Sequence, residues 1–136
     1  MIFQGTVQSG FGTGGYYVQL PHYFEAFTEL LQKPPFPGTL NVLFSNEDYS
    51  KLVESLRPLK PLIISGKTDA DDGTWRIECY CARIWTYNEN DKVRALLLRF
   101  SRPDHKKEII EFVSFHHLRE KFHLEDHSVI HFRLIP

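Results

Sequence analysis

Apolar residues alternate with polar ones, or form short runs, in several stretches of this chain, which is the pattern of β-strands. Strands are predicted at residues 2–8, 16–20, 39–44, 62–64, 74–85, 93–100, 108–113 and 128–135. Turn-forming residues separate these stretches at intervals of roughly ten residues, and helices are too few for alternating βαβ units. The pattern therefore predicts a mainly β protein, built as a small antiparallel or mixed barrel.

Helical spacing of apolar residues occurs in only two or three places. Pro21 suits the first turn of a helix, because a proline there lacks only an N–H that would have no partner. The helix is predicted to end before Pro34, and its apolar face consists of Phe24, Phe27, Leu30 and Leu31. A short helix is predicted from residue 46 to 53. Another is predicted after Ser114, whose hydroxyl can cap it.

The composition fits one domain over residues 1–136, with a net charge of −1 that disfavours a nucleic-acid binder. No signal peptide is visible, and no apolar run approaches the roughly 20 residues that span a bilayer. A soluble, cytoplasmic protein with no membrane partner is expected. Cys79 and Cys81 would point to the same side of one strand, and reduced thiols are the expected state.

Residues 9–15, Ser-Gly-Phe-Gly-Thr-Gly-Gly, contain four glycines and stand out as candidate chemistry. Backbone N–H groups of such a loop can form a concave seat for phosphates. A strand is predicted after this loop, which excludes the dinucleotide-binding fingerprint, and Tyr16 after Gly15 excludes the Gly-Lys-Ser/Thr nucleotide loop. A flexible turn is the commoner role of a glycine-rich hairpin.

Thr39 and Asn41 should share one face of their strand, where a hydroxyl and an amide oxygen could bind Mg²⁺ beside substrate phosphates. The alternative is the polar face of a half-buried strand. A third stretch, residues 108–120, contains Glu108 and Glu111, which should face opposite ways, so that one of them could face a pocket.

Taken together, the stretches resemble the CTP-dependent riboflavin kinases known mainly from archaea. The resemblance covers nearly the whole chain and is densest in residues 5–42 and 108–130. It is carried by Gly5-x-Val7-x-Ser9-Gly10-x-Gly12-x-Gly14-x-Tyr16, Leu20-Pro21-x-Tyr23, Pro37-Gly38-Thr39-Leu40-Asn41, Glu108-Ile109-Ile110-Glu111 and Leu118-Arg119-Glu120-x-Phe122-x-Leu124-x-Asp126.

This resemblance implies a six-stranded cradle-loop β-barrel with two or three short helices, and transfer of the γ-phosphoryl group of CTP to the 5′-hydroxyl of riboflavin. It implies Mg²⁺ held by Thr39 and Asn41, with Glu111 contacting the flavin and counted with them as catalytic. The residues implied to bind the nucleotide are Gly10, Phe11, Gly12, Thr13, Gly14, Gly15, His116, His117, Leu118 and Arg119.

Three departures from the family pattern concern flavin binding. Pro103 stands where relatives carry a threonine, Asp126-His127 replaces their Asp-Gly turn, and Ser114-Phe115 replaces their Ala-Pro. They leave open a non-catalytic flavin- or nucleotide-binding barrel acting as a sensor. The residues alone do not choose between CTP and ATP, nor say whether Glu111 is a base. A monomer is expected.

Overall fold

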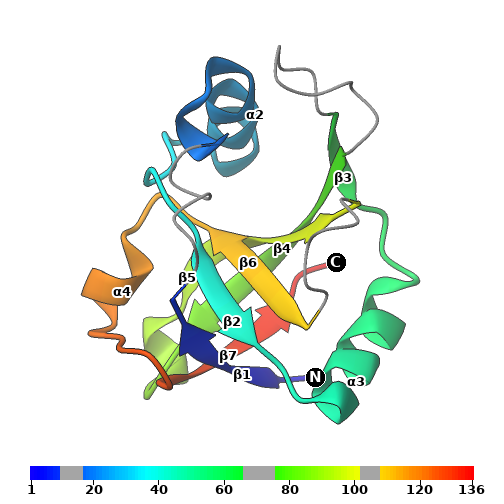
Figure 1. The fold of residues 1–136 in the computed structure, drawn as a ribbon, viewed down its shortest axis with the longest axis vertical. Helices are drawn as coiled ribbons and strands as arrows, with labels where there is room; N and C mark the ends of the chain where they lie inside the picture. The colour runs from blue at the N-terminus through cyan, green and yellow to red at the C-terminus, as the bar shows by residue number, and fades with distance from the viewer. Residues whose placement is uncertain (10–16, 66–75, 102–107) are drawn as a thin grey trace.

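The computed structural model describes residues 1–9, 17–65, 76–101 and 108–136 (Figure 1). Its strands are β1 (Phe3–Gln8), β2 (Leu40–Leu43), β3 (Leu62–Ser65), β4 (Arg76–Trp85), β5 (Val93–Phe100), β6 (Ile109–Val113) and β7 (Val129–Leu134). They form one antiparallel sheet in the order β3-β4-β5-β6-β2-β1-β7, and β4 also pairs with β7. Six of the described strands therefore close into a barrel, which confirms the predicted fold class.

Strand β4 is shared between the barrel and an extension of it. Its first half pairs with β3, from Arg76 to Cys79, and its second half pairs with β7, from Ala82 to Trp85. Both partners use the same edge of β4, while β5 follows the other edge along almost its whole length. Strand β3 therefore extends the sheet beyond the barrel (Figure 1).

Among the described residues, helices occur at α2 (Pro21–Leu31), α3 (Asn46–Leu56) and α4 (Leu118–Lys121), with a 3₁₀ turn at Glu89–Asp91. Helix α2 begins at Pro21, as predicted, and its C-cap residue, Gln32, has the left-handed conformation. Helix α3 continues to Leu56, beyond its predicted end, and the Ser45 side chain accepts a hydrogen bond from the N–H of Asp48 at its start. None of the helices that the structure describes is long and apolar enough to cross a membrane.

Two details of the predicted secondary structure are wrong. Residues 17–19 form a helical turn leading into α2 rather than a strand, because Tyr17 and Val18 are buried against the outer face of the sheet and against α2. Ser114 does not cap α4. Its hydroxyl donates to the carbonyl of Arg94 at 2.8 Å and accepts from the N–H of His116, so the helix begins later, at Leu118.

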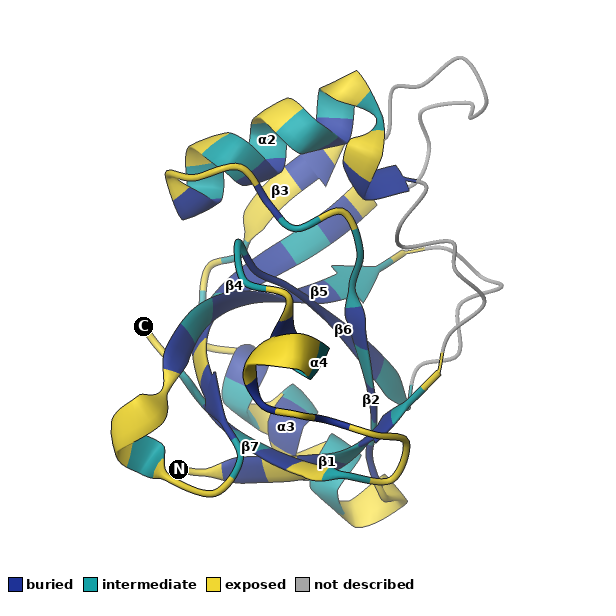
Figure 2. Cartoon of the chain, turned by 90° about the vertical axis from the view of Figure 1, so that its left-hand side faces the viewer, coloured by how far each residue is buried: buried dark blue, intermediate teal, exposed yellow. Residues whose placement is uncertain are grey.

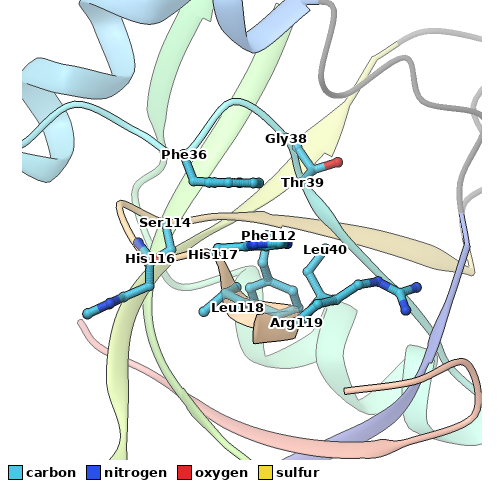
Figure 3. Close-up of a pocket in the computed structure, with 10 residues that line it drawn as sticks. All are labelled: Phe36, Gly38, Thr39, Leu40, Phe112, Ser114, His116, His117, Leu118 and Arg119. Atoms are coloured by element: carbon cyan, nitrogen blue, oxygen red, sulfur yellow. The ribbon is translucent and has the colours of Figure 1, made fainter. Parts of the chain in front are cut away.

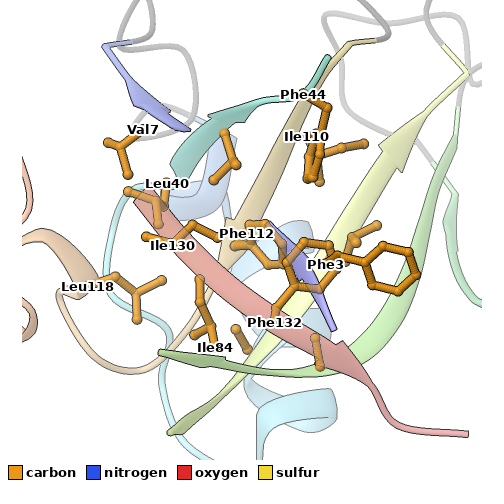
Figure 4. Packing of buried hydrophobic residues seen from close by; sticks show 14 of the residues in the cluster. Phe3, Val7, Leu40, Phe44, Ile84, Ile110, Phe112, Leu118, Ile130 and Phe132 are labelled. Atoms are coloured by element: carbon orange, nitrogen blue, oxygen red, sulfur yellow. The ribbon is translucent and has the colours of Figure 1, made fainter. Parts of the chain in front are cut away.

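The apolar residues form two clusters on opposite faces of the sheet. The barrel interior holds the larger one, in which Phe112 and Phe132 are completely buried (Figure 4). Helices α3 and α4 add Leu52 and Leu118 to this cluster, and Figures 1 and 2 show these helices at opposite ends of the barrel. The smaller cluster lies between the outer face and α2, with Phe27 fully buried.

Cys79 and Cys81 both belong to the outer cluster, as their spacing predicted, and both are free thiols. Burial, with smaller effects of Cys81 and Glu78, raises the pKa of the Cys79 thiol to about 12. The Cys79 thiol is therefore protonated and unreactive at neutral pH, which fits a packing role.

Candidate functional site

The candidate site lies on the outer face of the barrel, where β2 and β6 run side by side. Leu40 and Val42 point into the barrel core, so the alternating residues Thr39 and Asn41 share one face, as predicted, and that face is the outer one. Asn41 stands directly opposite Glu111 on β6 and opposite Gln8 on β1. Residues far apart in the sequence thus meet on three adjacent strands.

Glu111 accepts hydrogen bonds from two side chains through the same carboxylate oxygen, Oε1. The Thr39 hydroxyl donates to it at 2.8 Å and the Tyr17 hydroxyl at 3.2 Å. Only 7% of Glu111 is exposed, so these bonds compensate a carboxylate that is nearly removed from water. Glu111, rather than the half-exposed Glu108, is therefore the buried acid of this stretch.

The contact with Glu111 also fixes how Thr39 can act. A hydroxyl has one proton and two lone pairs, and the proton of Thr39 is directed to Glu111. Its oxygen lone pairs are then oriented away from the carboxylate and available to a cation. Glu111 is thus positioned to orient the Thr39 hydroxyl through a direct hydrogen bond.

These oxygens fit a magnesium ion in their chemistry. Thr39 and Asn41 supply hard, neutral oxygens, and Glu111 supplies negative charge next to them. Among the described residues, no group of three or more His, Cys, Asp or Glu side chains gathers to bind a metal. A metal at Thr39 and Asn41 would therefore complete its coordination with water and substrate phosphates, as Mg²⁺ commonly does.

The predicted phosphate-binding residues from Gly10 to Gly15 lie outside the described residues. Two described residues near the ends of this stretch, Gln8 and Tyr17, contact the candidate site. Gln8 pairs with Asn41, and the Tyr17 hydroxyl donates to Glu111. The described chain therefore passes beside the oxygens that could bind a metal both before residue 10, at Gln8, and after residue 16, at Tyr17.

Asp126 links the start of the glycine stretch to Arg119. Its carboxylate accepts from the Ser9 hydroxyl at 2.9 Å and from Nη2 of Arg119 at 2.9 Å. The hydrogen bond from Arg119 has the largest effect in holding the pKa of Asp126 below its usual range, and the hydrogen bond from Ser9 adds to it. Asp126 is therefore ionised at neutral pH, and the Ser9–Asp126–Arg119 network stays intact there.

A small pocket lies next to this network and collects the other predicted nucleotide-binding residues. It measures about 50 Å³ and is lined by Phe36, Gly38, Thr39, Leu40, Phe112, Ser114, His116, His117, Leu118 and Arg119 (Figure 3). The rings of Phe36 and His117 stack at 4.1 Å, with an interplanar angle of 6°. Ligand pockets typically measure ~300–1,000 Å³, so a nucleoside would lie across the rim of this pocket rather than inside it.

His116 and His117 point in different directions, as expected for neighbouring residues. His117 stacks on Phe36, whereas Figure 3 shows His116 turned away from that pair. Partial burial, with the nearby ammonium groups of Lys121 and Lys33, holds the pKa of His116 below its usual value. His116 is therefore neutral at neutral pH.

The structure adds Phe36, Ser114, Asp126 and Tyr17 to the candidate site. The hydroxyl of Tyr17 could not be placed beside Glu111 from the sequence, because residues 16–20 resembled a strand. Asp126 was visible within a motif but had no assigned partner. The turn at Asp126-His127 is retained: His127 has φ 77°, a conformation that favours glycine, and its N–H donates to the carbonyl of Val7. Pro103 lies outside the described residues.

The comparisons with known proteins point in one direction. A family profile named CTP-dep_RFKase, described as "Domain of unknown function DUF120", matches residues 7–134. The riboflavin kinase of Methanosarcina mazei is 32% identical over 123 residues, which cover 90% of this chain and 52% of that protein. The riboflavin kinase of Sulfolobus acidocaldarius is 32% identical over 124 residues, covering 88% of this chain and 72% of that protein.

Length differs among these relatives. The riboflavin kinase of Methanobrevibacter smithii is 27% identical over 130 residues and is covered over 97% of its length. In contrast, the chain spans about half the length of several curated relatives, including the M. mazei protein. The profile match over nearly the whole chain, with these similarities, shows that the chain belongs to the archaeal-type CTP-dependent riboflavin kinase family.

Proposed function

We propose that this chain transfers the γ-phosphoryl group of CTP to the 5′-hydroxyl of riboflavin, giving FMN and CDP, with Mg²⁺ as cofactor. The observation that carries the proposal is that Thr39, Asn41 and Glu111 meet where β2 pairs with β6, in contact with Gln8 before the glycine stretch and with Tyr17 after it. Family membership supports the same activity, since the curated relatives are riboflavin kinases.

Phosphoryl transfer requires positioning and neutralisation of charge more than a reactive side chain. The bond between the γ-phosphorus and the oxygen that leaves with CDP breaks as the riboflavin 5′-oxygen bonds to that phosphorus. When bound at Thr39 and Asn41, Mg²⁺ would neutralise charge on the triphosphate. The chain itself would supply backbone N–H groups from residues 10–15 and the positive charge of Arg119.

Glu111 has two roles in this proposal. It orients the Thr39 hydroxyl through the 2.8 Å hydrogen bond, and it is the residue that the family resemblance places against the flavin. Because only 7% of Glu111 is exposed, a flavin contact would be limited to the small accessible part of its carboxylate. The hydrogen bond from Tyr17 to the same oxygen, Oε1, also helps to hold that carboxylate in place.

The direct test is FMN formation from riboflavin by the purified chain, with CTP or ATP as donor and with Mg²⁺ present or chelated. We expect turnover with CTP and Mg²⁺, little turnover with ATP, and none after chelation. Binding of CDP or FMN without turnover would contradict the proposal and favour a sensor. Faster turnover with ATP would contradict the assignment of CTP alone.

Asp126 offers a second test of the site, because it holds Arg119 and Ser9 without belonging to the metal-binding set. We expect Asp126→Asn to raise the KM for CTP about 3- to 10-fold with little change in kcat, because the loss of a charge-assisted hydrogen bond frees Arg119. Steady-state kinetics with varied CTP measure this. Asp91→Asn is the matched control, since Asp91 is also exposed and also pairs with a cation, Lys121, at 3.7 Å. Equal KM values in the two variants would remove Asp126 from the site.

A further inference from the structure

Arginine side chains cluster at one position on the outer face of the barrel. Arg83 on β4 stands directly opposite Arg94 on β5 and directly opposite Arg133 on β7. Three arginines thus occupy one row across three adjacent strands, whose backbones lie about 5 Å from one to the next. Like charges that face each other across strands are destabilising, so this row calls for a compensating role.

The three arginines differ in their partners. The guanidinium of Arg133 is paired with Glu89 at 2.8 Å, and Nη2 of Arg94 donates to the carbonyl of Leu30 at 2.9 Å. Arg83 is exposed and makes no ion pair or side-chain hydrogen bond with the part of the chain that the structure describes. The uncompensated charge therefore lies at Arg83 and, in part, at Arg94, where no carboxylate faces it.

A groove runs over this uncompensated charge. It has a volume of about 450 Å³, and its lining residues are Leu31, Gln32, Lys33, Arg83, Lys92, Val93, Arg94, Phe115 and His116. Four of these side chains are cations and none is a carboxylate. Asp91, the acid next to Lys92 in the sequence, pairs with Lys121 instead. The volume falls within the ~300–1,000 Å³ of small-molecule sites.

We propose that Lys33, Arg83, Lys92 and Arg94 form a second anion site, separate from Thr39 and Asn41, that binds a small molecule carrying two or more phosphoryl groups. Guanidinium groups bind phosphate oxygens in a bidentate manner, and lysines add point charges at the rim. The ring of Phe115, with Nζ of Lys33 4.6 Å from its centre, offers an apolar surface beside the charges.

The extent of the charge favours a small ligand over a nucleic acid. Glu89 neutralises the row at Arg133, so the free charge ends at β4 and does not continue as a stripe around the barrel. The whole chain has a net charge of −1, whereas nucleic-acid-binding domains usually carry an extended basic face. Because Lys33, Arg83, Lys92 and Arg94 line a single groove, a diphosphate or triphosphate fits this charge better than a long polymer does.

The groove is also connected to the candidate nucleotide pocket. His116 lines both cavities. The carbonyl of Arg94 accepts from the Ser114 hydroxyl at 2.8 Å, and that hydroxyl accepts from the N–H of His116. An anion held by Arg94 would therefore act on a segment that is hydrogen-bonded to the wall of the nucleotide pocket.

The test is calorimetric titration of the full chain with inorganic pyrophosphate, with magnesium chelated, in the wild type, Arg83→Gln and the control Arg57→Gln. Arg57 is an exposed arginine at the C-terminal end of α3, where it is paired with Glu54. We expect Arg83→Gln to weaken pyrophosphate binding about 5- to 10-fold, while Arg57→Gln binds like the wild type. Arg83→Gln should keep or raise the Tm, because it relieves repulsion within the row.

Equal affinity in all three proteins, or no binding by the wild type at millimolar pyrophosphate, would overturn the proposal. A parallel titration with a single-stranded oligonucleotide provides the other arm: tighter binding of the oligonucleotide, lost in Arg83→Gln, would make the groove a nucleic-acid surface and also overturn it. The kinase assay with CTP separates this inference from the proposed function. An inactive wild type that still shows Arg83-dependent pyrophosphate binding refutes only the kinase proposal.

Discussion

Asn41→Ala is expected to lower the rate of FMN formation at least about 100-fold, because a ligand for Mg²⁺ is lost where charge on the transferring phosphoryl group must be stabilised. The fold should survive, since Asn41 faces outward from β2 while Leu40 and Val42 hold that strand to the core. The measurement is kcat with CTP at several Mg²⁺ concentrations, together with the Tm.

Asn41→Asp is the matched control, because it keeps an oxygen at the same position. It should retain a larger part of the Mg²⁺-dependent activity than Asn41→Ala, although its added charge next to Glu111 will cost some of that activity. Wild-type turnover by Asn41→Ala would remove Asn41 from the metal site. A loss of activity accompanied by an equal loss of Tm would show instead that Asn41 acts on the fold.

Gly5→Ala is expected to reduce the free energy of unfolding by about 1–3 kcal/mol, and Gly5→Val by more, because β1 passes too close to β2 for a side chain. A Cβ at residue 5 would lie 2.5 Å from Cγ1 of Val42 and 2.9 Å from the carbonyl oxygen of Leu43. The backbone oxygen cannot move without shifting β2. Thermal unfolding measures the effect, and a fall in Tm of roughly 5–10 °C is expected for Gly5→Ala.

Gly38→Ala serves as the control for this prediction. A Cβ there would meet only the ring of Phe36, at 3.3 and 3.6 Å, and a side-chain ring can give way by a few tenths of an ångström. We expect a Tm close to that of the wild type. If the Tm of Gly5→Ala is as close to that of the wild type as the Tm of Gly38→Ala, β1 and β2 can separate at little cost.

The strands could be predicted because each depends on a local pattern. Val93–Phe100 was predicted with its observed ends, since a turn signal precedes its apolar run and a polar segment follows. The helical turn at residues 17–19 could not be predicted, because the β-forming residues Tyr17 and Val18 also suit a buried helical turn. The choice depends on the face of the sheet that they cover. The predicted helix cap at Ser114 is wrong for a similar reason: its hydroxyl donates to the carbonyl of Arg94, which is distant in sequence.

For the site, the sequence predicted that Thr39 and Asn41 share one face of their strand, since alternation along the strand decides it. Their closeness to Glu111 follows from the pairing of β2 with β6. From the sequence, it could be expected only through the family resemblance. The row of Arg83, Arg94 and Arg133 could not be predicted at all. It depends on the register of three strands, and a shift by one residue would move every one of these side chains to the other face.

The place of β7 between β1 and β4 has a consequence for how the chain folds during translation. The six-stranded barrel cannot close until residues 129–134 have left the ribosome. Until then, β1 and the second half of β4 each keep one edge without its partner strand, β7. Pairings between such distant segments form slowly, and open strand edges can pair with other chains in the meantime. Nascent chains stalled before residue 129 should therefore be the species most in need of a chaperone.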